Sequence, residues 1–355
     1  MENKKHYYSL DFLKFLLSIL ILFHHFQMTT LVDFGKIDFV EGIFNFAMLV
    51  EFFFIISGFL SGMTADKTGK SSFETFIGKK IRRLYPTAIL SVIVMTVLIM
   101  IDYLLNGVFR QGLVPDIFKF FNSILITFSG YSIKVGRGIN NPLWYVGVLM
   151  ICYIIFYLIL RISERNGIKP IYLFVFVCLL GIGIHDYGID LPFANEDVSR
   201  GYAAFFYGLI LYELYRNYSH RFLYLFSYLT LIVCGLLFII NYTAFYQYQW
   251  GSFVFVIFPC VLFVFLSLEN YLGFKFFQVL GGVSYEIYVW HSLFNHLILM
   301  SENILKPLYD QPFLFLGIYT LIVVLFSYVM YSFVEKPLTK AVISCYSKIR
   351  KQDAE

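Results

Sequence analysis

The sequence predicts an all-α polytopic integral membrane protein with about ten transmembrane helices and both termini in the cytoplasm. Its composition is the first reason, since 59% of the 355 residues are hydrophobic and only 14% are charged. Ordinary soluble domains contain about 25% charged residues, so this composition excludes a soluble enzyme, a disordered chain and a nucleic-acid binder. The other two reasons are a series of long apolar stretches and an uneven distribution of lysine and arginine.

Ten apolar stretches are candidates for membrane spans, because a helix needs roughly 20 apolar residues to cross a bilayer. They cover residues 10–28, 42–63, 84–105, 143–160, 171–184, 201–215, 222–240, 251–268, 277–300 and 313–334. The fifth and sixth are short, which indicates tilted or broken helices. The apolar stretch 117–128 is too short to span, and we interpret it as an interfacial or re-entrant helix.

The first stretch is interpreted as a retained helix and not as a cleaved signal. Lys4 and Lys5 precede it, but it contains Asp11 and Lys14, and no small-residue cleavage site follows. We expect one transmembrane domain over residues 1–340 and a short cytoplasmic tail over 341–355.

The basic residues support this arrangement, because cytoplasmic loops of membrane proteins are enriched in Lys and Arg. With the N-terminus inside, 19 of the 27 Lys and Arg fall on the cytoplasmic side and seven fall outside or in the interfacial helix. Lys14 is the remaining one and lies within the first span. The net charge of +4 therefore reflects topology.

The first span contains a polar stripe. Lys14 and His25 are eleven residues apart, which returns to within about 20° of the same helix face over a rise of about 16 Å. Asp11 and Ser18 lie close to this stripe, whereas His24 points about 100° away. Charges inside a membrane usually face a cavity or a partner. The alternative is that Lys14 extends to the inner interface and both histidines lie at the outer one.

Two other spans place polar side chains at matching depths. Counting about 1.5 Å per residue, Glu51 and Glu286 share a middle layer, and His25 and His291 share an outer layer. On the ninth span, Tyr288 shares a face with His291. A hydrogen-bonded core histidine and a structural pairing of Glu286 are the alternatives.

Residues 64–83 form the most basic segment, which we expect to be a cytoplasmic loop. It ends in KKIRRLYP, and Pro86 is expected to begin the third helix because proline suits a first turn. Lys80, Arg82 and Arg83 would lie at the cytoplasmic mouth of that helix. They suit either plain anchoring to lipid phosphates or a clamp for the phosphates of a nucleotide-bearing donor.

The five cysteines are isolated, without a CxxC motif or a Cys/His cluster. They predict neither disulfides nor a metal site.

Six segments in chain order resemble the membrane-bound acyltransferase family 3, the O-acyltransferases of bacterial surface glycans. The first span opens with YYSLDFLKF and reproduces a basic-residue-x10-His spacing as Lys14 and His25, although arginine is commoner at the first position. VEFFFIISGFLSG resembles the second-helix motif, with Glu51 where Asp is common and with Ser57 in its core. KKIRRLYP resembles the basic motif, with Lys80 and Arg83 in the R-x-x-R places.

The other three segments lie in the second half of the match. NPLWYVGVLMICY contains the Leu-Trp motif with Trp144. GGVSYEIYVWHSLF resembles the late signature through Ser284, Tyr285, Tyr288, Trp290 and His291. SYVMYSFVEKPL resembles the closing pattern through Ser327, Tyr328, Glu335 and Pro337.

The resemblance implies transfer of an acyl group, most often acetyl, from cytoplasmic acyl-coenzyme A to a sugar hydroxyl at the outer face of a bacterial cell membrane. We expect Lys14, Lys80, Arg82 and Arg83 to bind the donor, and no bound cofactor is implied. A separate extracytoplasmic transferase is a possible partner for the acyl group, besides the glycan or lipid-linked glycan acceptor.

A sugar hydroxyl needs a base to remove its proton, and histidine suits this role near neutral pH. We predict His25 as the base, with His291 second and with a glutamate near the ring, such as Glu51, holding the tautomer. The oxyanion needs donors, for which Ser57, Tyr288 and Trp144 are candidates. Tyr285, Glu286 and Glu335 are expected to support the site.

Two other classes of function fit the same polar residues. A proton-coupled transporter or glycan exporter also contains intramembrane glutamates, lysine and histidines. A lipid-embedded subunit of a synthase complex would keep them for assembly. The sequence leaves open the acceptor and the choice between acetyl, succinyl and longer acyl groups.

Overall fold

The computed structural model describes residues 6–42, 45–110, 113–131, 138–241, 248–342 and 344. Within these ranges the regular elements are helices, apart from two isolated β-bridges that join Phe34 to Ile37 and Leu191 to Ala194. The predicted all-α class is confirmed. Of the expected tail, only residues 341, 342 and 344 are described.

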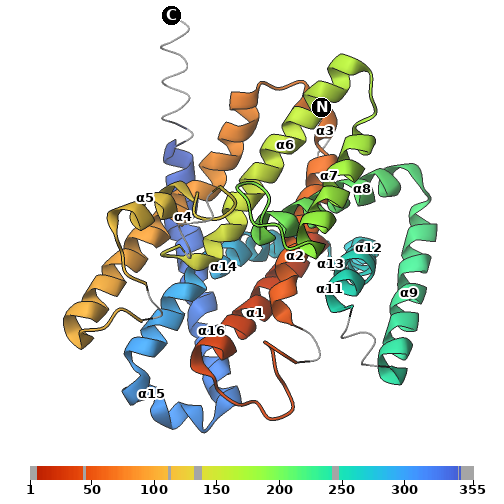
Figure 1. Cartoon of the computed structure of the whole chain (residues 1–355). Coiled ribbons are helices and arrows are strands. Elements are labelled where there is room, and N and C mark those ends of the chain that lie inside the picture. Colours follow the sequence, from red (N-terminus) through yellow and green to blue (C-terminus); the bar gives the residue numbers. More distant parts are fainter. Residues whose placement is uncertain are drawn as a thin grey trace, which may run out of the picture.

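Ten longer helices form most of the molecule (Figure 1). They are α1 (Tyr8–Thr30), α2 (Leu49–Gly62), α4 (Phe73–Asn106), α6 (Trp144–Asn166), α7 (Pro170–Asp186), α8 (Glu196–Asn217), α9 (His220–Ile240), α12 (Phe258–Ser267), α14 (Phe276–Met300) and α16 (Pro312–Val329). The short helices are α3 (Ala65–Gly69), α5 (Ile117–Leu125), α11 (Gln249–Ser252), α13 (Glu269–Leu272) and α15 (Glu302–Tyr309). Single 3₁₀ turns at Phe46–Met48 and Asn141–Leu143 precede α2 and α6.

Each of the ten apolar stretches coincides with one of these helices. Among the described residues, six helical segments are long and apolar enough to cross a membrane: Tyr8–Thr30, Phe73–Asn106, Asn141–Asn166, His220–Ile240, Gln249–Ser267 and Pro312–Val342. Phe46–Gly62 and Pro170–Asp186 are shorter apolar helices. The chain is therefore a multi-pass membrane protein, while the count of ten spans and the side of the termini stay predictions.

The expected loop over residues 64–83 is wrong for residues 73–83, which belong to α4, whereas residues 64–72 connect α2 to α4 through the short helix α3. Ser72 caps α4 by accepting a hydrogen bond from the Thr75 amide at 3.3 Å, and the helix then continues to Asn106 with Pro86 in its interior. Proline does not begin this helix, because the polar residues before it are themselves helical. A membrane helix tolerates such a proline where neighbours bond the freed backbone groups. Near this point the Tyr285 hydroxyl donates to the Leu84 carbonyl at 2.5 Å.

Two spans contain a π-helical turn. One turn, Phe253–Ile257, lies between α11 and α12 and directly precedes Pro259. Proline removes an amide donor and clashes with the carbonyl four residues back, and a wider turn relieves that clash. The second π turn, Met330–Glu335, extends α16 and sets the position of Glu335.

The predicted interfacial stretch forms the nine-residue helix α5, which is too short to span. Its Ile117, Phe118, Phe121 and Leu125 side chains are exposed. An exposed apolar face of this kind is typical of a helix that lies in the membrane interface.

The core depends on close contacts between helix backbones. α8 packs against both α2 and α7. A Cβ atom on Gly58 of α2 would lie 1.9 Å from the Phe205 carbonyl oxygen, and one on Gly208 would lie 2.2 Å from that of Ile55. Small residues let membrane helices approach in this way. α1 packs along α14, where a Cβ on Gly281 would meet the Asp11 carboxylate at 2.5 Å.

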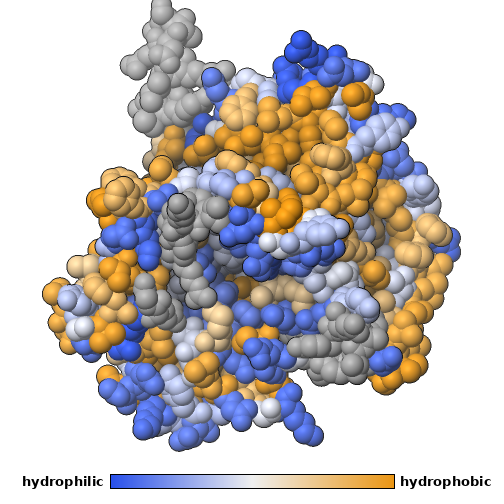
Figure 2. Space-filling model, in the orientation of Figure 1, coloured by the Kyte–Doolittle hydropathy of each residue, from blue (hydrophilic) through white to orange (hydrophobic). Residues whose placement is uncertain are grey.

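α9 is the least buried of the six candidate spans. Only Leu223 and Ser227 of this helix are buried, and Figure 1 shows it at the right-hand edge of the bundle. Hydrophobic residues cover its outward side in Figure 2. Such a surface is stable only where lipid covers it.

Candidate active site

Two histidines from different helices form the centre of the candidate site. His25 of α1 and His291 of α14 stack with ring centroids 4.8 Å apart and ring planes inclined by 27°. This direct contact agrees with the prediction that the two histidines lie at the same depth. The contact depends on the packing of α1 along α14. Counting the helical rise along each span does not identify which helices are neighbours.

The hydrogen bonds of His291 assign its tautomer. Its Nδ1 lies 3.2 Å from the Ile287 carbonyl oxygen, which only accepts, so Nδ1 carries a hydrogen. Its Nε2 is buried and has no hydrogen-bond partner in the described part of the chain. The lone pair of Nε2 is thus available to a substrate proton.

His25 is held through its backbone. The Asn295 amide donates to the His25 carbonyl at 3.4 Å, and the Tyr319 hydroxyl donates to the Asn295 side-chain oxygen at 2.6 Å. These contacts connect α1, α14 and α16. No described residue forms a hydrogen bond with the His25 ring, which is only half-buried and so remains able to react.

His24 has a different role. Its Nδ1 lies 3.0 Å from the Phe39 carbonyl oxygen, and the residue is buried. Its ring meets His25 edge-on, at 5.1 Å between centroids. The hydrogen bond fixes the loop after α1, in agreement with the prediction that His24 points away from the polar stripe.

Glu51 is bound by partners that the sequence did not predict. Its two oxygens accept from Arg200 Nε and Nη2 at 2.7 and 2.8 Å, and Oε1 also accepts from Trp250 Nε1 at 3.0 Å. Arg200 in turn lies 4.7 Å above the Trp144 ring and donates to the Ala47 carbonyl at 3.0 Å. Glu51 is 1% exposed and fully engaged, so it does not hold a histidine tautomer in this structure.

Arg200 is the site residue that sequence reasoning missed. It is one of the seven Lys and Arg that the ten-span arrangement puts outside or in the interfacial helix, yet it lies in the second turn of α8 with its side chain only 17% exposed. It is close enough to His24 and Tyr288 for its charge to act on both. A signal was available, since Glu51 required a cation and Arg200 begins an apolar stretch.

Glu286 lies one turn before Trp290, whose indole N–H donates to Glu286 Oε2 at 2.8 Å. Its other oxygen, Oε1, is buried without a partner in the described part of the chain. Glu335 Oε2 is also buried without a hydrogen-bond partner among the described residues. Neither carboxylate forms an ion pair with a described residue, and the described structural partner of Glu286 is the Trp290 indole.

The predicted donor-binding residues divide into two groups. Lys14 pairs with Asp11 at 2.5 Å and lies close enough to Arg83 for the two charges to repel. Arg83 is exposed and forms no ion pair with any described residue. Two neighbouring cations, of which only Lys14 is paired with a carboxylate, suit an anionic ligand.

Lys80 and Arg82 make other contacts. Lys80 Nζ lies 3.9 Å from the centroid of the Tyr153 ring and 5.6 Å from that of Phe76. Arg82 lies on the same turn of α4, next to Gly78. Both cations therefore line the basic end of α4, but Lys80 is partly engaged by cation–π contacts.

The three candidate oxyanion donors differ in availability. The Tyr288 hydroxyl donates to the Pro142 carbonyl at 2.5 Å. Ser57 Oγ shares a hydrogen bond with the Tyr145 hydroxyl at 3.2 Å. No described residue accepts from the Trp144 indole nitrogen, and one of the two hydroxyls in the Ser57–Tyr145 pair also keeps a hydrogen to donate.

The described residues contain no group of three or more His, Cys, Asp or Glu side chains that could hold a metal ion. The polar residues present are acid–base groups, cations and hydroxyls. This set can bind an anionic donor at one level of the membrane and remove a proton at another.

Comparisons with known proteins identify the family. A family model described as an acyltransferase domain, that of acyltransferase family 3, matches residues 7–332. No curated protein matches the chain, and neither does any solved structure. The matched segment includes both histidines, the Glu51–Arg200 pair and the basic end of α4. The chain therefore belongs to the membrane acyltransferase family 3.

Proposed function

We propose that this acyltransferase moves an acyl group, acetyl in the first instance, from cytoplasmic acyl-coenzyme A to a hydroxyl of a surface or lipid-linked glycan. The observation that supports this most directly is the stack of His25 on His291. It puts two imidazoles from different helices in direct contact inside the helix bundle. The acyl-coenzyme A is a substrate, and the reaction needs no bound cofactor.

In the proposed reaction His25 removes the proton of the acceptor hydroxyl while its oxygen attacks the thioester carbonyl. The tetrahedral intermediate collapses, the carbon–sulfur bond breaks, and the proton passes from His25 to the departing thiolate. The products are the glycan ester and free coenzyme A, so the protons balance. His291 is the second imidazole, which orients His25 or the acceptor, and the Trp144 N–H is the proposed oxyanion donor.

The inner end of the bundle is proposed to bind the coenzyme A phosphates. Lys14 and Arg83 supply charge there, with Lys80 and Arg82 on the adjoining turns of α4. The rise from Lys14 to His25 is about 16 Å, which is comparable to the length of a pantetheine arm. The arm would thus deliver the thioester from the phosphate level to the histidines.

Replacing Arg83 with alanine is expected to weaken donor binding about 10- to 100-fold, since a charge-assisted hydrogen bond contributes about 1.5–3 kcal/mol. Acceptor affinity should change little. Titration of acyl-coenzyme A into the purified variant measures this effect. Arg161→Ala is the matched control, because Arg161 is exposed and bonded to Glu164 and the Gly69 carbonyl. If Arg83→Ala bound acyl-coenzyme A as tightly as the wild type, the basic segment would serve only to anchor the protein to the membrane.

We further propose ten spans in a bacterial plasma membrane with both termini in the cytoplasm. Lys36 and Lys67 are both exposed and fall on opposite sides in this arrangement. A membrane-impermeant maleimide applied from outside should label Lys36→Cys and leave Lys67→Cys unlabelled. Labelling of both, or of Lys67→Cys alone, would contradict the arrangement.

Acyl-coenzyme A consumption by inverted membrane vesicles tests the function itself. Vesicles that contain the protein should release coenzyme A thiol and transfer radiolabelled acetyl to glycan, whereas a proton-coupled transporter or exporter would leave the thioester intact. Mass analysis of the surface glycan with and without the gene then identifies the acceptor. Thiol release that requires a second, extracytoplasmic transferase would show that the acyl group passes to a partner.

A further inference from the structure

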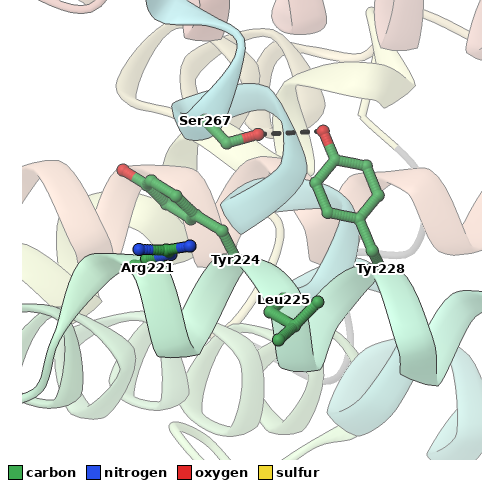
Figure 3. Close-up of a pocket in the computed structure, with 5 residues that line it drawn as sticks. All are labelled: Arg221, Tyr224, Leu225, Tyr228 and Ser267. Carbon is green, nitrogen blue, oxygen red and sulfur yellow. Dashed lines mark hydrogen bonds between the residues drawn. The ribbon is translucent and has the colours of Figure 1, made fainter.

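A groove runs along the lipid-facing side of the molecule, between α9 and the end of α12. One face of α9 lines it with Arg221, Tyr224, Leu225 and Tyr228, and Ser267 of α12 closes it (Figure 3). The groove has a volume of about 450 Å³ and opens outward. It is separate from the histidine site, because neither His25 nor His291 lines it.

The hydroxyls deep in this groove satisfy one another. Ser267 Oγ donates to the Val264 carbonyl at 2.7 Å, which uses its only hydrogen. The Tyr228 hydroxyl, 3.0 Å away, must therefore donate to Ser267. This part of the groove can face hydrocarbon without an unsatisfied polar group.

Arg221 is different, because no described residue forms an ion pair or a hydrogen bond with it. The nearby Arg216 shows the contrast, since it pairs with Glu213 at 3.1 Å. The Tyr224 hydroxyl is engaged with that of Tyr215 at 3.3 Å. The open end of the groove thus presents the Arg221 guanidinium to a ligand.

The depth of these groups matches the layers of a bilayer. Arg221 is the second residue of a helix that is long and apolar enough to span, so it lies at the headgroup level. Tyr228 lies seven residues further along, or about 10 Å deeper, and Leu225 lies between them. A ligand that fills the groove therefore needs an anionic group at one end and an apolar body below it.

We propose that this groove binds an anionic phospholipid, with its phosphate on Arg221 and an acyl chain along Leu225 and the neighbouring side of α9. The planar fork of arginine matches phosphate oxygens in a bidentate way, and the surrounding membrane supplies the lipid. The bound lipid completes the contact between α9 and α12, where α9 buries only Leu223 and Ser227 of its own. This proposal is independent of the acyl-transfer reaction.

Native mass spectrometry of the full chain in detergent tests the proposal, with phosphatidylglycerol and phosphatidylcholine as probes. We expect the wild type to retain phosphatidylglycerol preferentially. Arg221→Gln should lower its retention about tenfold, the effect of losing one charge-assisted hydrogen bond. Arg216→Gln, which removes an already paired arginine five residues earlier, should leave retention unchanged. Phosphatidylglycerol should also raise the melting temperature of the wild type and not that of Arg221→Gln.

Three results would overturn the proposal. Equal retention of phosphatidylglycerol by Arg221→Gln and wild type would show that Arg221 does not bind the lipid. Equal retention of phosphatidylcholine and phosphatidylglycerol would mean that the anionic charge is not recognised. Competition by soluble glycerol 3-phosphate at a concentration similar to that of the lipid would assign the groove to a free phosphate. Because Arg221 is exposed, the variant is expected to fold, and its elution on size exclusion verifies this.

Discussion

His25→Ala is expected to reduce acyl transfer by about 10²–10⁴-fold, the usual contribution of general acid–base catalysis. Expression and donor binding should stay close to those of the wild type, because no described residue bonds to the His25 ring. The measurement is transfer of radiolabelled acetyl by purified protein in vesicles, with donor affinity determined in parallel.

His24→Ala is the matched control, since its ring bonds to the Phe39 carbonyl and turns away from His291. It should have a mild effect. His291→Ala should reduce transfer to an intermediate degree through loss of the stacked partner. A folded His25→Ala protein with more than about a tenth of wild-type activity would contradict the assignment. If His291→Ala alone produced the severe loss, its free Nε2 would make it the base in place of His25.

Arg200→Ala is expected to destabilise the protein by about 3–5 kcal/mol, the usual result of leaving one member of a buried ion pair without its partner. Glu51 would keep only the Trp250 hydrogen bond while 1% exposed. Thermal stability in detergent, followed by size exclusion, measures the loss. Arg200→Lys should recover part of it, because lysine keeps the charge and loses the bidentate fork.

The double variant Glu51→Gln with Arg200→Gln distinguishes loss of the ion pair from the cost of leaving one buried charge unpaired. It removes both charges at once and should be more stable than Arg200→Ala. A single Arg200→Ala variant as stable as the wild type would show that Glu51 is neutralised by another group, and the pair would then have no structural role.

Hydropathy predicted most of the helices because the membrane imposes one requirement, an apolar stretch of sufficient length, on each of them separately. The path of α4 through Pro86 was not predictable in this way. A proline begins many helices, and hydropathy does not show that residues 73–83 before Pro86 are already helical.

The sequence predicts the depth of the site residues in the membrane. It does not predict which residue contacts which. Counting along each helix placed His25 and His291 at one level, since rise per residue is nearly constant. The partner of Glu51 is 149 residues away on α8, and the α2–α8 contact depends on Gly58 and Gly208. No periodicity in either helix encodes which helix lies opposite. Pairings of this kind therefore required the structure.

The continuity of α4 has a consequence for how tightly the proposed anionic donor would be held at its basic end. At 34 residues the helix is about 51 Å long, which exceeds the roughly 30 Å hydrocarbon layer, so its first turns extend beyond the membrane as a rigid rod. Lys80, Arg82 and Arg83 are thus fixed to a helical scaffold before any ligand arrives. Ordering a flexible loop of the same composition would consume about 1–2 kcal/mol of backbone entropy per residue. This segment loses little of that entropy on association, so more of each phosphate contact remains as affinity.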